Sequence, residues 1–189
     1  MTFVRPEDAS SRWVRLPEPD EAAAIAIVAY LRAYGPATME NFHNWISRGR
    51  VSTRQLRAWF DSVGDRLREV EVDGERRYVL AGDLEELAST KPTNAVRLLP
   101  GFDQYVLGPG TDDAHVLPKA RRTAVSKQSG WIAPIVVAGG AVRGTWEIAA
   151  DTVEVAWFKE AAPVPRTALQ AEVDRLATIL GRDLRLALG

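Results

Sequence analysis

The spacing of hydrophobic positions predicts three short helices in the first half of the chain. They are expected at Asp20–Tyr34, Thr38–Ser47 and Ser52–Val63, where apolar residues return every three to four positions. Gly35 followed by Pro36 ends the first helix, because proline cannot continue one. An irregular lead-in, residues 1–19, precedes them.

Two alternating segments follow the helices and predict a β-hairpin. Leu67–Val72 and Glu75–Leu80 flank the pair Asp73-Gly74, and Asp-Gly between alternating apolar residues is typical of a hairpin turn. Three helices followed by a hairpin form a winged helix, a helix-turn-helix variant that usually lays its third helix in a DNA groove. The pattern therefore predicts a winged-helix domain at residues 20–90 and indicates nucleic acid as its partner.

Alternation returns in the second half of the chain and predicts a sheet. Strands are expected at Val96–Leu99, Ile132–Val137, Ala141–Ile148 and Thr152–Phe158, followed by a helix at Arg166–Leu180 and a last strand at Leu184–Leu188. We expect a small curved β-sheet or barrel with a C-terminal helix over residues 91–189, beginning near Pro92. The predicted fold class is α+β, with two domains.

Composition limits the kinds of function that this chain can have. Its 189 residues are 46% hydrophobic and 26% charged, which is ordinary for a globular protein with a real core. The absence of cysteine excludes disulfides and thiolate metal sites. The chain has only two histidines, and no spacing of residues suggests metal ligands, so we expect no metal site. No nucleotide-binding motif is present, so no cofactor is expected. No apolar run could cross a bilayer and no signal peptide begins the chain, so we expect a cytoplasmic protein without a membrane partner.

Charge is distributed unevenly although the net charge is only −1. Between Ala114 and Trp146 the chain has five lysines and arginines and no Asp or Glu. Such a local basic surface binds phosphate even on a neutral protein. The candidates for phosphate contact are His115, Lys119, Arg121, Arg122, Lys127 and Arg143. The alternative is a solvated surface that acidic residues from elsewhere in the fold neutralise, and the sequence leaves both interpretations open.

The predicted winged helix has its own candidates for DNA contact. Arg54, Gln55 and Arg57 lie on its third helix, and arginine and glutamine can each form two hydrogen bonds with a base edge. Arg76 and Arg77 follow the hairpin turn. Residues 41–80 contain eight arginines and six acidic residues, a surplus of only two, so a solvent-facing helix is the alternative interpretation.

Carboxylates and tryptophans offer the remaining candidate chemistry. Asp103, Asp112 and Asp113 lie in a loop-rich stretch, where a carboxylate beside a basic surface could activate water. We favour a role in turns, because Asp near Gly and Pro often bonds its own backbone. Trp131 follows a glycine at the edge of the basic stretch and is the candidate for stacking on a base. The tryptophans at positions 45, 59, 146 and 157 match core periodicity and are expected to be buried.

Several motifs resemble those of a known family. The stretch Leu98-Leu-Pro-Gly-Phe-Asp-Gln-Tyr-Val-Leu-Gly108, the basic residues around Lys119–Val125 and the strand Val142-Arg-Gly-Thr-Trp146 resemble the AlkZ-like winged-helix family. The resemblance runs from about Glu21 to the end of the chain. Characterised members are DNA glycosylases that release alkylated bases and unhook interstrand crosslinks, built from tandem winged helices and a C-terminal β-barrel. The resemblance implies that this chain corresponds to the last winged helix and the barrel, with double-stranded DNA as its partner.

The family's catalytic motif, Gln-x-Gln or Gln-x-Asp, does not follow any of the glutamines at positions 55, 104, 128 and 170. The resemblance therefore implies DNA contact more than catalysis, and no catalytic residue is assigned. Our main hypothesis is a bacterial DNA-binding protein that is non-catalytic as this chain stands. One alternative is a DNA glycosylase that acts on alkylated or crosslinked bases, with Met1 as a misplaced start inside a longer enzyme. Another is an interaction module that pairs with a separate protein supplying further winged helices.

Overall fold

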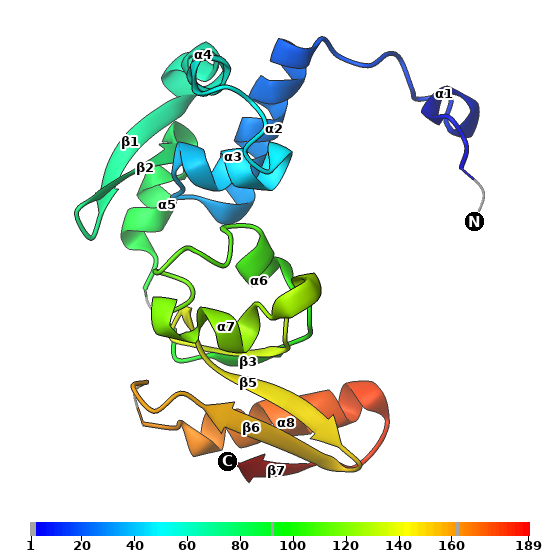
Figure 1. The fold of residues 1–189 in the computed structure, drawn as a ribbon, viewed down its shortest axis with the longest axis vertical. Coiled ribbons are helices and arrows are strands. Elements are labelled where there is room, and N and C mark those ends of the chain that lie inside the picture. Colours follow the sequence, from blue (N-terminus) through cyan, green and yellow to red (C-terminus); the bar gives the residue numbers. More distant parts are fainter. Residues whose placement is uncertain (1–2, 92, 162) are drawn as a thin grey trace. The chain divides into compact units, whose positions relative to one another are not determined.

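The computed structural model describes residues 3–91, 93–161 and 163–189 and is a mixed fold of helices and sheets (Figure 1). The chain divides into two compact units. Unit 1 comprises Met1–Met39 and Val51–Asp83, and unit 2 comprises Glu40–Arg50 and Leu84–Gly189. Pro92, near which we expected the second domain to begin, lies outside the described residues. The domain limits at residues 20–90 and 91–189 stay a prediction.

Unit 1 is built on two amphipathic helices, α2 (Pro19–Tyr34) and α4 (Thr53–Val63). Helix α2 contacts both α4 and strand β2 of the hairpin, and the apolar stripes of both helices are buried. Ser52 caps α4, because its side-chain oxygen accepts the N–H of Gln55 at 3.2 Å. The lead-in, expected to be irregular, contains one helical turn, α1 (Pro6–Ala9).

The hairpin of unit 1 has the predicted register and turn. Strands β1 (Leu67–Val72) and β2 (Glu75–Leu80) are antiparallel, with Val72 opposite Glu75. The turn residues Asp73 and Gly74 have φ angles of 51° and 80°. A two-residue turn that matches the strand twist needs positive φ at both positions, which explains the Asp-Gly pair. Two short helices, η1 (Gly64–Arg66) and η2 (Ala81–Asp83), precede and follow the hairpin.

Helix α3 (Met39–Ser47) follows α2 in the chain, as expected, but groups almost entirely with unit 2. Its Asn41 side chain donates to the carbonyl of Pro109 at 2.7 Å, which fastens α3 to the loop-rich stretch of unit 2. Phe42 is fully buried, whereas Trp45 is 41% exposed. The prediction of a buried Trp45 was wrong, because so short a helix buries only a narrow stripe.

Unit 2 contains a five-stranded sheet in the order β3-β4-β5-β6-β7. The strands are β3 (Val96–Leu99), β4 (Ile135–Ala138), β5 (Ala141–Ala149), β6 (Thr152–Trp157) and β7 (Arg185–Leu188). The first four are antiparallel neighbours, and β7 pairs in parallel with β6 after the crossover helix α8 (Arg166–Leu180). In the described part of the chain β3 and β7 are the sheet edges and do not pair with each other. The sheet is therefore open rather than a closed barrel.

Both faces of this sheet are covered. Leu169 and Val173 of α8 pack with Val136 and Val153 on one face. The residues next to Val136 point the other way and join a second cluster with residues of the stretch between β3 and β4. That stretch forms only short helices, namely α6 (Gln104–Leu107), η3 (Lys119–Arg121), α7 (Arg122–Val125) and η4 (Gln128–Gly130). Apolar anchors such as Val125 therefore position the basic stretch on the sheet.

Helix α5 (Leu84–Ser89) completes the described elements. Within residues 3–91, 93–161 and 163–189, no helix is long and apolar enough to cross a membrane.

Candidate nucleic-acid interface

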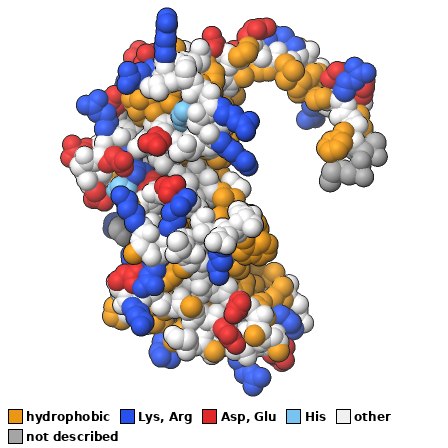
Figure 2. Space-filling view, viewed as in Figure 1, with side chains coloured by type: hydrophobic (Ala, Val, Ile, Leu, Met, Phe, Trp, Pro, Cys, Tyr) orange, Lys and Arg blue, Asp and Glu red, His pale blue; other side chains and the backbone are white. Residues whose placement is uncertain are grey.

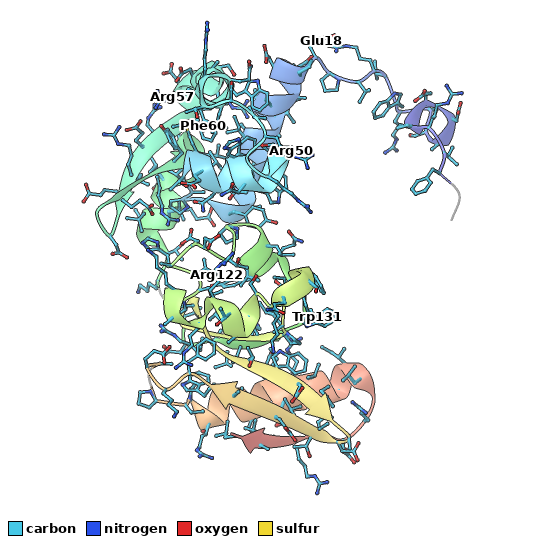
Figure 3. The ribbon with its side chains drawn as sticks, viewed as in Figure 1. Glu18, Arg50, Arg57, Phe60, Arg122 and Trp131 are labelled. Carbon is cyan, nitrogen blue, oxygen red and sulfur yellow. The ribbon has the colours of Figure 1, made fainter. Side chains whose placement is uncertain are left out.

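Helix α4 presents two arginines to solvent. Leu56 and Phe60 on one side of the helix are buried, so Arg54 and Arg57 on the other side are exposed. Figure 3 labels Arg57 on this helix. Neither guanidinium forms an ion pair within the described residues, so both are available to an anionic ligand.

Gln55, the third candidate on α4, already has a partner. Its amide nitrogen donates to a carboxylate oxygen of Asp20 at 3.0 Å, and the indole nitrogen of Trp59 donates to the same oxygen at 2.7 Å. Asp20 thereby ties the start of α2 to α4. Contact between Gln55 and a base stays a prediction, and it would have to replace this bond.

The two hairpin arginines differ sharply from each other. Arg76 is exposed and pairs with Glu69 across the hairpin at 3.3 Å. Arg77 is only 7% exposed, and its guanidinium donates to Glu75 at 2.7 and 2.9 Å and to the carbonyl of Pro36 at 3.2 Å. We therefore assign Arg77 a structural role and leave it out of the interface, because a buried and satisfied guanidinium is not presented to DNA.

Acidic residues neutralise part of the basic stretch in unit 2. Arg121 forms a bidentate ion pair with Glu160, in which two guanidinium nitrogens donate to the two carboxylate oxygens. Its guanidinium also lies 5.0 Å from the ring centre of Phe158. The hydrogen bond from Arg121 lowers the pKa of Glu160 to about 2. Arg122 pairs with Asp112 at 2.7 Å.

Three cations of the stretch have no acidic partner in the part of the chain that the structure describes. Lys119 and Lys127 are exposed, and Arg143 is partly exposed with only a long contact of 3.4 Å to the carbonyl of Ala138. On the visible face, basic and acidic side chains are interspersed rather than sorted into one basic surface (Figure 2). The candidate phosphate contacts of unit 2 are therefore Lys119, Lys127 and Arg143.

His115 lies against a buried carboxylate. Its Nδ1 is 3.3 Å from Asp113, whose side chain is 1% exposed and also accepts the backbone N–H of His115 at 2.9 Å. The imidazole is about one third exposed and is oriented by this contact. Contact of His115 with phosphate stays a prediction.

The loop carboxylates mostly serve local structure, as the turn interpretation predicts. Asp103 caps α6 by accepting the N–H of Tyr105 at 2.8 Å, and Asp113 holds the following turn. Asp112 is the partner of Arg122. Among the described residues, no three histidine or carboxylate side chains could together hold a metal ion.

Two further exposed arginines were missed as candidates. Arg48 and Arg50 flank Gly49 in the turn that links α3 to α4, and neither forms an ion pair in the described structure. Figure 3 labels Arg50. The Arg-Gly-Arg sequence could have indicated them, because two cations in one tight turn are a signal of anion contact.

Comparisons with known proteins agree with the resemblance of the motifs. Residues 3–179 match the family described as DNA glycosylase AlkZ-like. The chain belongs to the AlkZ-like DNA glycosylase family. It is 46% identical over 182 residues to an interstrand DNA cross-link repair glycosylase of Streptomyces sahachiroi. It also superimposes on the solved structure of Streptomyces sahachiroi DNA glycosylase AlkZ with a TM-score of 0.92, at 45% identity. Each match covers 96% of this chain and 49% of the relative, so the chain spans about half the length of these AlkZ-like proteins.

Proposed function

We propose that this chain is a DNA-binding member of the AlkZ-like DNA glycosylase family, in which the helices and hairpin near its start act as a winged helix on duplex DNA. The observation that carries the proposal is a set of fully or partly exposed cations without acidic partners in the described residues. The set comprises Arg54 and Arg57 on α4, the exposed Lys119 and Lys127 in unit 2, and the partly exposed Arg143 of β5. Membership of a family of DNA glycosylases makes duplex DNA the ligand that these cations fit best.

The two parts of the set are assigned different tasks. An arginine on an exposed helix face can reach base edges or phosphates in a groove, as Arg54 and Arg57 would from α4. The lysines of the stretch between β3 and β4 are assigned to backbone phosphates, because contacts to phosphate fix the position of the protein and do not depend on base identity. Each phosphate contact adds about 0.9 to the slope of the logarithm of the binding constant against the logarithm of salt concentration.

The test is a salt series of binding to a labelled duplex. Replacing Lys119 and Lys127 with alanine should lower the salt slope by about 1.8, since two phosphate contacts are lost. Arg182→Ala removes the same kind of charge beyond α8, which covers the opposite face of the sheet, and serves as the control with an unchanged slope. Absence of duplex binding by the wild type at low salt, or equal effects of both changes, would contradict the proposal.

Base release by the chain itself is the second candidate function. It is favoured by the 46% identity to a curated cross-link repair glycosylase. The test is release of an alkylated base from a defined duplex, compared between wild type and Asp103→Ala. Asp103 caps α6 through its side chain, so the variant should keep any release activity of the folded protein. Loss of release with the fold intact would instead give Asp103 a role in activating water.

A further inference from the structure

Two aromatic side chains form an exposed pair on unit 2. Phe102 is 46% exposed and Trp131 is 55% exposed. Their ring centres lie 5.0 Å apart at an angle of 85°, an edge-to-face contact. The proposed phosphate contacts do not involve this pair, which we call the aromatic pair. Figure 3 labels Trp131.

The backbone that carries Phe102 is strained and tightly anchored. Phe102 has a φ of 62°, a left-handed conformation that is uncommon and strained for a residue other than glycine. Gly101 precedes it, and a Cβ there would lie 2.8 Å from the carbonyl oxygen of Ile132, so the loop packs directly on the segment after Trp131. Asp103 fixes the other side by capping α6. These anchors hold a large apolar ring at the surface rather than in the core.

Trp131 is held by a second tight turn that also carries a lysine. Ser129 and Gly130 have φ angles of 63° and 77°, and the N–H of Lys127 donates to the carbonyl of Trp131 at 2.8 Å. The turn therefore brings the backbones of Lys127 and Trp131 side by side. The side chain of Lys127 is exposed and has no acidic partner within the described residues.

Lys127 and Trp131 also line one open groove of about 640 Å³ above strands β5 and β6. Glu147 and Glu154, which face each other across these strands, line the same groove. Two adjacent carboxylates repel phosphate, whereas Lys127 attracts it. A nucleotide bound here would therefore keep its phosphate at the lysine and its uncharged base along the groove.

We propose that Trp131, supported by its edge-to-face contact with Phe102, stacks against one unpaired base of DNA while Lys127 binds the neighbouring phosphate. An edge-to-face pair leaves an indole face for a base, and stacking on an aromatic ring tolerates any base. This inference rests on the proposed DNA-binding function and assigns a site to a particular DNA feature within it.

The experiment compares binding to two labelled duplexes of equal length, one fully paired and one with a single unpaired nucleotide. The wild type should prefer the second duplex. Trp131→Leu keeps apolar bulk but loses the stacking face, so its affinity for the duplex with the unpaired nucleotide should fall about tenfold, with less than a twofold change on the paired duplex. Trp131→Phe should retain most of the preference. Trp13→Leu, at an exposed indole of the lead-in, is the matched control.

The outcomes distinguish failure of the proposed stacking site from failure of the proposed DNA binding. Equal losses on both duplexes for Trp131→Leu, or no preference by the wild type, would overturn the stacking site while leaving duplex binding intact. An equal loss for the Phe and Leu variants would also overturn it, because stacking would not explain the effect. Failure of the wild type to bind either duplex would overturn the proposed function and the inference together.

Discussion

Replacing Glu172 with alanine should lower the free energy of unfolding, because it removes the hydrogen bond that joins helix α8 to strand β3. Glu172 of α8 is only 3% exposed, and its carboxylate accepts the backbone N–H of Leu98 at 3.1 Å. Strand β3 is a sheet edge, so this N–H points to the helix rather than to another strand. Arg175 donates twice to the same carboxylate at 2.7 Å, and Arg97 lies 3.7 Å away.

The expected magnitude follows from what each partner loses. Leu98 is buried, and a buried donor left without an acceptor costs about 1–3 kcal/mol. The side chains of Arg97 and Arg175 are 54% and 50% exposed, so water replaces most of their interaction and each loss is at most about 1 kcal/mol. We therefore expect Glu172→Ala to lower the free energy of unfolding by about 1–5 kcal/mol.

Two measurements check this. Urea unfolding gives the free energy, and hydrogen exchange followed by NMR should show that the Leu98 amide loses protection selectively. Glu154→Ala, at an exposed glutamate of β6, is the control and should not lower stability comparably, because its carboxylate lies opposite the like charge of Glu147 and has no favourable interaction with it to lose. A loss for Glu172→Ala no larger than that of the control, or unchanged protection of Leu98, would refute the reasoning.

The same site predicts a pH dependence. Burial raises the pKa of Glu172, but the hydrogen bonds from Arg175 and Leu98 and the nearby positive charges outweigh it, so the pKa lies below its ordinary value of 4.5. A carboxyl with a lowered folded pKa stabilises the fold above its unfolded pKa and loses this contribution as the pH falls through the folded value. The stability difference between wild type and Glu172→Gln should therefore narrow below pH 4.5. A constant difference down to pH 2 would contradict this assignment.

Other contacts give further predictions. Gly144→Ala should destabilise the sheet by about 1–3 kcal/mol, because the new Cβ would lie 2.6 Å from a carbonyl oxygen of β6; unchanged urea unfolding would contradict this. The Glu160 carboxyl should titrate near pH 2 by NMR and move up towards 4.5 in Arg121→Ala, and no movement would exclude the Arg121 pair as the cause. Arg77→Ala should cost about 1–3 kcal/mol in thermal unfolding because its buried donors hold Glu75, whereas the exposed neighbour Arg76→Ala should cost less than about 0.5 kcal/mol. Equal losses would contradict the two roles.

Local patterns predicted most elements of the fold. The Asp73-Gly74 pair predicted the hairpin because its backbone requirement involves only two residues, and both adopt positive φ. The apolar spacing similarly predicted a helix at Ser52–Val63, where the structure has α4. The strands of the sheet were found by their alternation, which depends on residues only a few positions apart.

The tertiary arrangement of these elements could not be predicted from the same local patterns. Strand β7 pairs in parallel with β6, and β3 lies at the far edge of the sheet, so closure into a barrel could not be judged from alternation. Helices α6 and α7 have four residues each and are too short to show a periodicity. Asn41 provides another example, because its bond to Pro109 joins α3 to a loop 68 positions away.

Counting charges along the sequence overestimates the number of cations in the basic stretch that are available to a ligand. The stretch between Ala114 and Trp146 contains no acid, yet Asp112 lies just before it and Glu160 well after it, and the fold brings each to an arginine. Both acids pair with arginine, whose planar guanidinium suits a carboxylate, and the two lysines of the stretch stay unpaired in the described residues. This distinction matters for binding to a phosphate backbone. An arginine that is paired with a carboxylate must break that pair before it binds phosphate, whereas an unpaired lysine contributes its full binding free energy. The sequence therefore indicated a candidate segment for phosphate contact, whereas tertiary pairing decides which of its charges lack an acidic partner in the described residues.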